Sequence, residues 1–192
     1  MSNMKPVITL AAIVALISAL IIVVYELTYV DTSGILTEKQ ANAAVEIYGG
    51  VAEDYSVVPA EVWTAELSPE SDKELARITK IIQKNDGSLL FESVVKGYKD
   101  GFDIMVGVKD GAVSGVAIVS MGEETPGLGT KTNTPEFLGE FAGATEEVVI
   151  VKKAPSVDNE VQAVSSATFS SKGVAQAVNI ALKAYEKCGG DF

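Results

Sequence analysis

The first strong pattern along the chain is an uncharged run of Ile, Val, Leu and Ala that extends from Pro6 to Tyr25. As a helix this run spans about 30 Å, which is the hydrocarbon thickness of a bilayer. A buried core helix is the first alternative and a cleaved signal peptide the second. A signal peptide has a shorter apolar region that ends in a small-x-small cleavage site, and residues 25–29 contain no such site. We therefore expect residues 1–28 to form an uncleaved transmembrane anchor that crosses the membrane through residues 6–25.

Charges on either side of the run predict its orientation. Lys5 precedes it, whereas Glu26 and Asp31 follow it. The positive-inside rule then places the N-terminus in the cytoplasm and everything after Tyr25 outside. We expect a single-pass protein of the cell (inner) membrane with an extracytoplasmic domain.

Residues 29–74 are expected to form a tether and a helical lead-in. Thr37 and Gln40 have the spacing of a capping box, which predicts a helix over 38–48 that ends at Gly49. Residues 51–67 have no clear pattern, and Ser68-Pro69 predicts the start of another short helix.

The third part, residues 75–192, begins with the pattern of a β-meander. Asp-Gly dipeptides at 86, 100 and 110 favour tight turns between predicted strands at 76–84, 88–96, 102–109 and 112–120. Thr134-Pro135 predicts a short helix over 135–142, and a β-branched run predicts a fifth strand over 147–152. Apolar residues at helical spacing predict a last helix over 171–187, capped by Ser170 or Ser171. The predicted fold class is α+β, an antiparallel sheet packed with helices and preceded by one transmembrane helix.

Composition excludes several kinds of chemistry. The chain has 15 Lys+Arg, 26 Asp+Glu, a net charge of −11, no His and one Cys. Without His there is no Ser–His–Asp or Cys–His catalysis, and one Cys cannot hold an iron–sulfur cluster. The acidic balance disfavours nucleic acid as a partner. We predict no catalytic residue and no metal site.

Two segments carry residues that folding alone does not require. Glu123–Gly129 follows a strand, and its glycines at 127 and 129 allow a flat group to approach the backbone closely. An ordinary surface loop is the alternative. The second segment, Ser165–Ser171, has five hydroxyl side chains just before the last helix. A helix N-terminus offers N–H groups and a positive dipole to a phosphate, although Ser and Thr are also the usual caps.

The two segments together resemble the covalent FMN-binding domain. The resemblance rests on Glu124-Thr-Pro-Gly-Leu-Gly129 and on Ser165-Ser-Ala-Thr168 before a helix, and it covers roughly residues 75–187. This domain occurs in the G subunit of the Rnf ion-translocating complex and in the C subunit of sodium-translocating NADH:quinone reductase. The family's attachment motif is Asp-x-x-Ser/Thr-Gly-Ala-Thr, so Gln162 and Ser166 are departures from it.

The resemblance implies that Thr168 carries FMN through a phosphoester. It places around the cofactor's phosphate and ribityl chain the residues Ser165, Ser166, Ala167, Ser170 and Ser171. Along the isoalloxazine it places Thr125, Gly127, Leu128 and Gly129, with Glu124 fixing the loop through backbone N–H groups. Lys152 and Lys153 either reach the polar edge of the cofactor or form a solvated strand end.

The implied function is electron relay within an Rnf-type ferredoxin:NAD oxidoreductase, with no independent active site. The implied partners are the other membrane subunits of the complex and, during maturation, a flavin-attaching transferase. Three alternatives stay open: the C-type subunit of a quinone reductase, a non-redox anchored ligand-binding module, and an independent FMN-dependent reductase, for which no proton donor is evident.

Overall fold

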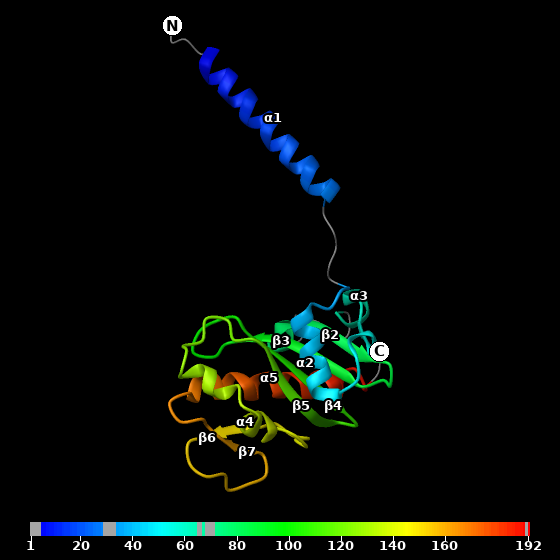
Figure 1. The fold of residues 1–192 in the computed structure, drawn as a ribbon, viewed down its shortest axis with the longest axis vertical. Coiled ribbons are helices and arrows are strands. Elements are labelled where there is room, and N and C mark those ends of the chain that lie inside the picture. The colour runs from blue at the N-terminus through cyan, green and yellow to red at the C-terminus, as the bar shows by residue number, and fades with distance from the viewer. Residues whose placement is uncertain (1–4, 29–33, 65–66, 68–71, 191) are drawn as a thin grey trace. The chain divides into compact units, whose positions relative to one another are not determined.

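The computed structural model describes residues 5–28, 34–64, 67, 72–190 and 192, which fall into two compact units divided after residue 32 (Figure 1). The first unit contains helix α1, Lys5–Thr28. Its stretch Pro6–Thr28 has a mean hydropathy of 3.1, so the helix is long and apolar enough to cross a membrane. The helix predicted for residues 6–25 is thus confirmed.

The second unit begins with helix α2, Glu38–Tyr48, which has the predicted capping box. The Gln40 N–H donates to Thr37 Oγ1 at 3.4 Å, and the Thr37 N–H donates to Gln40 Oε1 at 2.9 Å. The segment without a clear sequence pattern forms the 3₁₀ turn η1, Ala52–Asp54, strand β1, Tyr55–Val57, and helix α3, Ala60–Trp63. The short helix predicted at Ser68-Pro69 lies outside the described residues.

Five antiparallel strands form the main sheet in the order β1-β2-β3-β4-β5. After the 3₁₀ turn η2, Leu75–Arg77, come β2, Ile78–Lys84, β3, Leu89–Val95, β4, Phe102–Lys109, and β5, Ala112–Ser120. The predicted meander is confirmed to within two residues at every strand end. Asp110 and Gly111, with φ of 52° and 76°, make the turn between β4 and β5 as the Asp-Gly pattern indicates.

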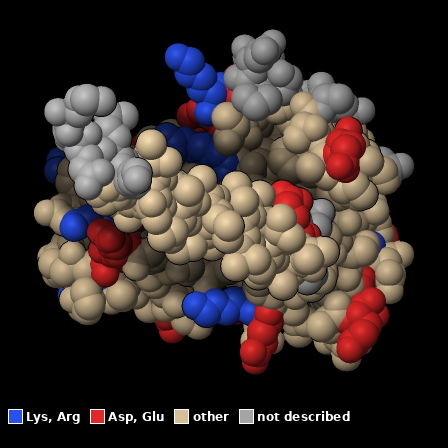
Figure 2. All heavy atoms as spheres, turned by 90° about the horizontal axis from the view of Figure 1, so that it is seen from above, with Lys and Arg blue, Asp and Glu red and all other residues tan. Residues whose placement is uncertain are grey.

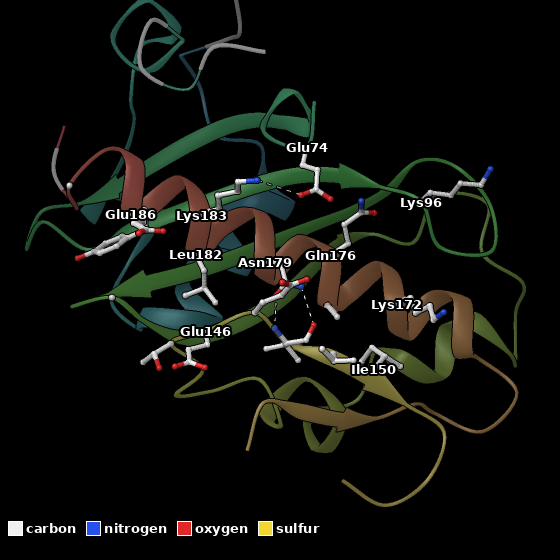
Figure 3. Close-up of a pocket in the computed structure, with 18 residues that line it drawn as sticks. Glu74, Lys96, Glu146, Ile150, Lys172, Gln176, Asn179, Leu182, Lys183 and Glu186 are labelled. Carbon is white, nitrogen blue, oxygen red and sulfur yellow. Dashed lines mark hydrogen bonds and ion pairs between the residues drawn. The ribbon is translucent and has the colours of Figure 1, made fainter. Parts of the chain in front are cut away.

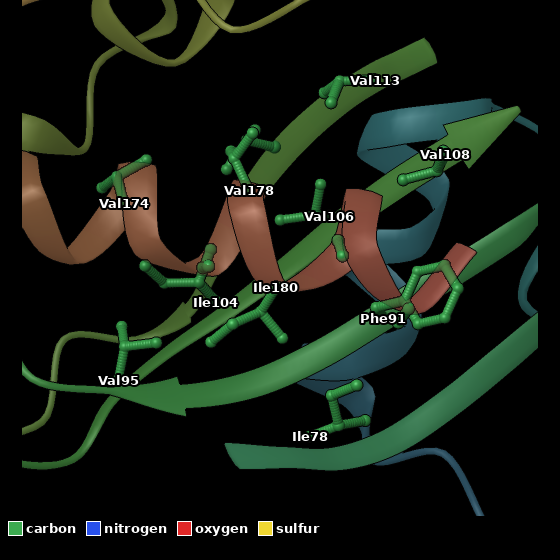
Figure 4. Close-up of a cluster of buried hydrophobic side chains, with 14 of the residues drawn as sticks. Ile78, Phe91, Val95, Ile104, Val106, Val108, Val113, Val174, Val178 and Ile180 are labelled. Carbon is green, nitrogen blue, oxygen red and sulfur yellow. The ribbon is translucent and has the colours of Figure 1, made fainter. Parts of the chain in front are cut away.

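Helix α5, Thr168–Lys187, covers one face of this sheet (Figure 4). Its Val174, Val178 and Ile180 pack against alternate residues of β3 and β4, among them Phe91 and Ile104. Each such side chain contributes about 1.5–3 kcal/mol when fully buried. The residues of β3 and β4 that alternate with these core residues point to the opposite face of the sheet. There Leu90 and Met105, together with Ala117 of β5, meet Ala43 and Ala44 of α2. The sheet therefore lies between α2 and α5, which confirms the α+β class. The predicted domain boundary between residues 74 and 75 remains a prediction. Helix α2, which belongs to the predicted lead-in, packs on the sheet.

The C-terminal part differs from the predictions in two places. The strand predicted over 147–152 is present as β6, Val149–Val151, but it pairs in parallel with β7, Glu160–Gln162, instead of joining the main sheet. The fifth strand of the main sheet is β1. Helix α5 begins at Thr168 instead of 171, and its N-cap is Ala167, because the hydroxyls of Ser170 and Ser171 are bonded elsewhere. Before β6, the 3₁₀ turn η3, Gly129–Thr132, is followed by helix α4, Pro135–Gly139, which begins after Thr134 as predicted and ends three residues before the predicted end at 142.

Candidate cofactor site

Thr168 is the first residue of α5 and is half-buried. The N-cap residue Ala167 is buried, and no side chain caps this helix. The first N–H groups of a helix have no partner within it, so an uncapped end leaves them available to an anion. Ser165 and Ser166 lie just before this end and are exposed to solvent. The predicted attachment threonine is therefore beside an uncapped helix terminus.

Ser166 adopts a left-handed backbone conformation with φ of 66°. Glycine adopts this region without strain, whereas other residues do so at a cost. The position is the one at which the attachment motif of the resembled family has Gly. The backbone at residue 166 thus has a conformation that glycine adopts without strain, even though the side chain departs from the motif.

Ser171 holds the segment in front of the helix. Its Oγ accepts a hydrogen bond from the Val164 N–H at 3.0 Å and donates to the Ala167 carbonyl at 3.0 Å. Ser170 is also buried, and its hydroxyl donates to the Glu124 side chain. Both hydroxyls are therefore engaged in hydrogen bonds that fix residues 164–171.

Glu124 joins three segments of the chain. Its side chain is buried, with 6% of the residue exposed. Oε1 accepts from the N–H groups of Tyr98 at 2.7 Å and Lys99 at 3.1 Å, and Oε2 accepts from Ser170 Oγ at 2.5 Å. The expected bonds to backbone N–H groups are present, and they come from the loop between β3 and β4. Tyr98 and Lys99 precede Glu124 by 26 and 25 residues, so no local sequence pattern indicated that this loop contacts Glu124.

The two glycines of the Glu124–Gly129 loop have different surroundings. A Cβ on Gly129 would collide with Glu124 Oε2 and with Ser170 Oγ, so this glycine makes room for the chain's own buried carboxylate. Gly127 has φ of 75° and open space on the side where a Cβ would point. Leu128 is 44% exposed and Thr125 is half-buried. Thr125, Gly127 and Leu128 are therefore on the accessible side of the loop.

Lys152 and Lys153 follow β6 directly and are exposed. The parallel pairing aligns Val151 with Gln162, and the Ala163 N–H donates to the Val151 carbonyl at 2.8 Å. The lysines thus leave β6 at the same end at which residues 163–167 leave β7 toward Thr168. Both interpretations of these lysines remain compatible with this placement.

Two aromatic residues near the site were missed by the sequence analysis. Tyr98 is 60% exposed and Phe169 is 63% exposed, and their rings lie 6.2 Å apart at an angle of 63°. Phe169 directly follows Thr168, which was a signal available in the sequence. Tyr98 had none, because its position depends on the hydrogen bond to Glu124.

A hollow of about 1050 Å³ in the described structure does not include Thr168 (Figure 3). It runs along the outer side of α5 next to β6, and charges of both signs line it, including Glu74, Glu146, Lys172 and Glu186. There the Asn179 side chain bonds both the N–H and the carbonyl of Val148, and Lys183 is paired with Asp72. A smaller hollow of about 640 Å³ adjoins the Glu124 contacts and is lined by residues of both loops, among them Tyr98, Lys99 and Glu123.

The charged side chains of the described residues form no metal-binding group, and the face seen in Figure 2 has no single large cationic patch. Among the described residues there is no group of three or more His, Cys, Asp or Glu side chains arranged to hold a metal ion. On the face seen in Figure 2, acidic and basic side chains lie in small separate groups. The arrangement around Thr168 is instead a hydroxyl, an uncapped helix end and exposed apolar side chains, which suits a phosphorylated aromatic group.

Comparison with known proteins agrees with this arrangement. A family model described as the FMN-binding domain matches residues 97–183. The chain is 32% identical to the G subunit of the Na⁺-translocating ferredoxin:NAD⁺ oxidoreductase complex of Acetobacterium woodii, over 95% of this chain and 93% of that relative. It is 36% identical to the G subunit of the proton-translocating ferredoxin:NAD⁺ oxidoreductase complex of Clostridium ljungdahlii, over 46% of this chain and 48% of that relative.

Among solved structures, that of Shewanella oneidensis NqrC has a TM-score of 0.45 at 21% identity and covers 56% of this chain and 58% of its own. The near-full-length match at 32% identity identifies the relationship, since it includes the anchor, the lead-in and the domain with the candidate site. The chain belongs to the family of G subunits of ion-translocating ferredoxin:NAD⁺ oxidoreductase complexes.

Proposed function

We propose that this chain relays electrons through an FMN covalently bound to Thr168, as the flavoprotein subunit of an Rnf-type ferredoxin:NAD⁺ oxidoreductase. The observation that carries the proposal is the position of Thr168 on the uncapped first turn of α5, the same turn in which Ser170 bonds Glu124 of the second motif. FMN, when bound, supplies the electron-accepting and electron-donating chemistry. The protein is left to hold, orient and shield the cofactor.

The residues of the site divide this work. Thr168 Oγ1 provides the phosphoester oxygen, and the N–H groups of the first turn stabilise the phosphate's remaining negative charge. Ser165, Ser166 and Ala167 form the wall on the N-terminal side, with Lys152 and Lys153 at the same end. Thr125, Gly127 and Leu128 present an accessible surface to the ring. Ser170, Ser171, Glu124 and Gly129 act by fixing these segments, because their polar atoms or space are already used within the protein.

Helix α1 anchors the chain in the cell membrane, and the FMN domain is on the extracytoplasmic side. Partners are the other membrane subunits of the complex and the transferase that attaches the flavin. Protease added to spheroplasts should cleave the domain without prior opening of the membrane. Cleavage only after lysis would reverse the proposed orientation.

The test of attachment is Thr168→Val in the full-length chain, produced together with the transferase. Valine keeps the shape of the side chain and removes the oxygen, so we expect a folded protein without the added FMN mass. Thr145→Val, which changes an exposed threonine beyond α4, is the matched control and should retain the flavin. Intact mass and flavin fluorescence in a denaturing gel measure the outcome. Flavin that remains covalently attached to Thr168→Val would contradict the assignment.

A further inference from the structure

Tyr98 and Phe169 form an exposed aromatic pair beside the attachment threonine. Phe169 is on the first turn of α5, Tyr98 is on the loop between β3 and β4, and their rings meet edge to face. More than half of each residue is exposed to solvent. Large aromatic side chains stabilise a fold mainly by burial, so two rings left in water next to each other indicate a surface that something covers.

The Tyr98 ring is on a loop that the protein fixes. The N–H groups of Tyr98 and of its neighbour Lys99 both donate to Glu124 Oε1. The second oxygen of the same carboxylate accepts from Ser170, which follows Phe169. One buried carboxylate therefore sets the backbone positions from which both aromatic rings project.

Resting on the proposed function, we propose that Tyr98 and Phe169 form an aromatic wall against which the isoalloxazine of the FMN on Thr168 packs. The ester is on the residue adjacent to Phe169, so the cofactor's ring is confined to the surface near this pair. Confinement by a covalent link makes packing an intramolecular event, and a small contact surface is then sufficient. Offset or edge-to-face contact between aromatic rings is a favourable arrangement in addition to the area that it buries.

The size of the pair favours the cofactor over a partner subunit. Stable protein interfaces bury about 1,200–2,000 Å² in total. The Tyr98 and Phe169 side chains supply only a small fraction of that interface area. Their combined size is instead comparable to that of one isoalloxazine ring system. Tyr98 also lines the smaller hollow of about 640 Å³, together with Lys99.

Flavin fluorescence distinguishes packing of the FMN ring on the Tyr98–Phe169 pair from binding of a partner subunit to it. A tyrosine in contact with an excited isoalloxazine transfers an electron to it and takes the electron back, so emission is lost as heat. We expect Tyr98→Leu to raise the fluorescence yield of the attached flavin severalfold, and Phe169→Tyr, which adds a second quencher, to lower it. Tyr185→Leu is the matched control, since Tyr185 is on the last turns of α5, and it should leave the yield unchanged. Intact mass confirms that each sample carries FMN, and visible circular dichroism reports the ring's surroundings.

The outcomes separate the two levels of the proposal. If Tyr98→Leu and Phe169→Tyr carry FMN but have the wild-type yield and dichroism, the aromatic wall is wrong while the attachment stands. The same holds if both variants change only the association with other subunits. If the wild-type chain carries no FMN, the proposed function itself fails.

Discussion

Ser170 Oγ donates a hydrogen bond to Glu124 Oε2 at 2.5 Å, and both side chains are buried. This bond connects the first turn of α5 to the loop that follows β5. The two segments that the sequence singled out, which are far apart along the chain, are therefore held together by one carboxylate–hydroxyl contact. The geometry of the candidate site therefore depends on that carboxylate as well as on Thr168, the threonine proposed to carry the cofactor.

The first prediction concerns Glu124. Glu124→Ala leaves the Ser170 hydroxyl and the Tyr98 and Lys99 N–H groups without their acceptor, which we expect to lower the free energy of unfolding by about 3 kcal/mol. Glu124→Gln keeps an acceptor for the two N–H groups and a donor toward Ser170, so its loss should stay below about 1.5 kcal/mol. Urea unfolding of both variants measures the difference. If both variants lower the free energy of unfolding by the same amount, hydrogen bonding by the Glu124 carboxylate is not the source of its stabilising effect.

The second prediction compares the two glycines of the loop. Gly129→Ala places a methyl group against the Glu124 carboxylate, whereas Gly127→Ala adds only the strain of a positive φ, about 1–2 kcal/mol. We expect Gly129→Ala to cost more stability and to reduce flavin occupancy. In a Glu124→Ala background the penalty of Gly129→Ala should shrink, because the colliding carboxylate is gone. An unchanged penalty in that double variant would show that the collision is not its cause.

The third prediction concerns the departure from the attachment motif at Ser166. Ser166→Gly removes the strain of a left-handed residue, about 1–2 kcal/mol, and adds about 0.5–1 kcal/mol of chain entropy. We expect a net gain of about 0.5–1 kcal/mol in the free energy of unfolding. Ser165→Gly, one residue earlier and without a positive φ, should give no gain. A rise in melting temperature for Ser165→Gly equal to that for Ser166→Gly would contradict this explanation.

A separate buried polar cluster lies on the α2 face of the sheet. Glu92 is 2% exposed, and Gln40 Nε2 donates to both of its carboxylate oxygens, at 2.9 and 2.7 Å. Lys80 Nζ donates to Gln40 Oε1 at 3.2 Å. Burial, followed by the neighbouring charge of Glu92, raises the pKa of Asp103 from 3.8 to about 7.

The fourth prediction follows from the sign of that shift. The folded protein holds a proton on Asp103 more tightly than the unfolded chain, so this stabilising contribution is complete below about pH 4 and is lost as the pH rises through about 7. Asp103→Asn resembles the protonated acid. We expect the variant to be more stable than wild type at about pH 8, with a difference that diminishes toward about pH 4. Asp158→Asn, on an exposed loop, is the control. Stabilities of Asp103→Asn and wild type that differ by a constant amount across this pH range would contradict the shift.

Most of the fold could be predicted because its signals are local. The uncharged apolar run predicted α1, and the capping box predicted α2. The Asp-Gly turns and the alternating pattern predicted the four long strands, and apolar residues at helical spacing predicted the body of α5. Strands β1 and β7 are three residues each, too short for a period to be distinguished. Strand β6 lies within the β-branched run that predicted a strand, but its parallel pairing with β7 could not be predicted. The start of α5 was misplaced because Ser170 and Ser171 are good caps by composition, and only the folded contacts show that their hydroxyls bond elsewhere.

The candidate site could be predicted from the sequence only where its residues belong to a contiguous motif. Thr168 and residues 124–129 belong to such motifs, and the structure brings the two segments together through Glu124. Tyr98 could not be found in this way, because its relation to Glu124 exists only after β3, β4 and β5 have paired. Gly129 was assigned to contact with the cofactor, whereas its missing side chain makes room for a carboxylate of the same chain.

The hydroxyl of Ser171 has a consequence for maturation. By bonding both the Val164 N–H and the Ala167 carbonyl, it closes residues 164–171 into a small ring of covalent and hydrogen bonds. The backbone around Thr168, the proposed acceptor, is thereby held by atoms of its own segment. An attaching enzyme that recognises this shape meets a rigid substrate and need not order it, so the entropy of ordering is lost during folding and not during modification. Because the ring is closed by residues 164–171 alone, the local shape ahead of the helix is set within one short segment, and the Ser170–Glu124 bond then fixes that segment to the rest of the domain.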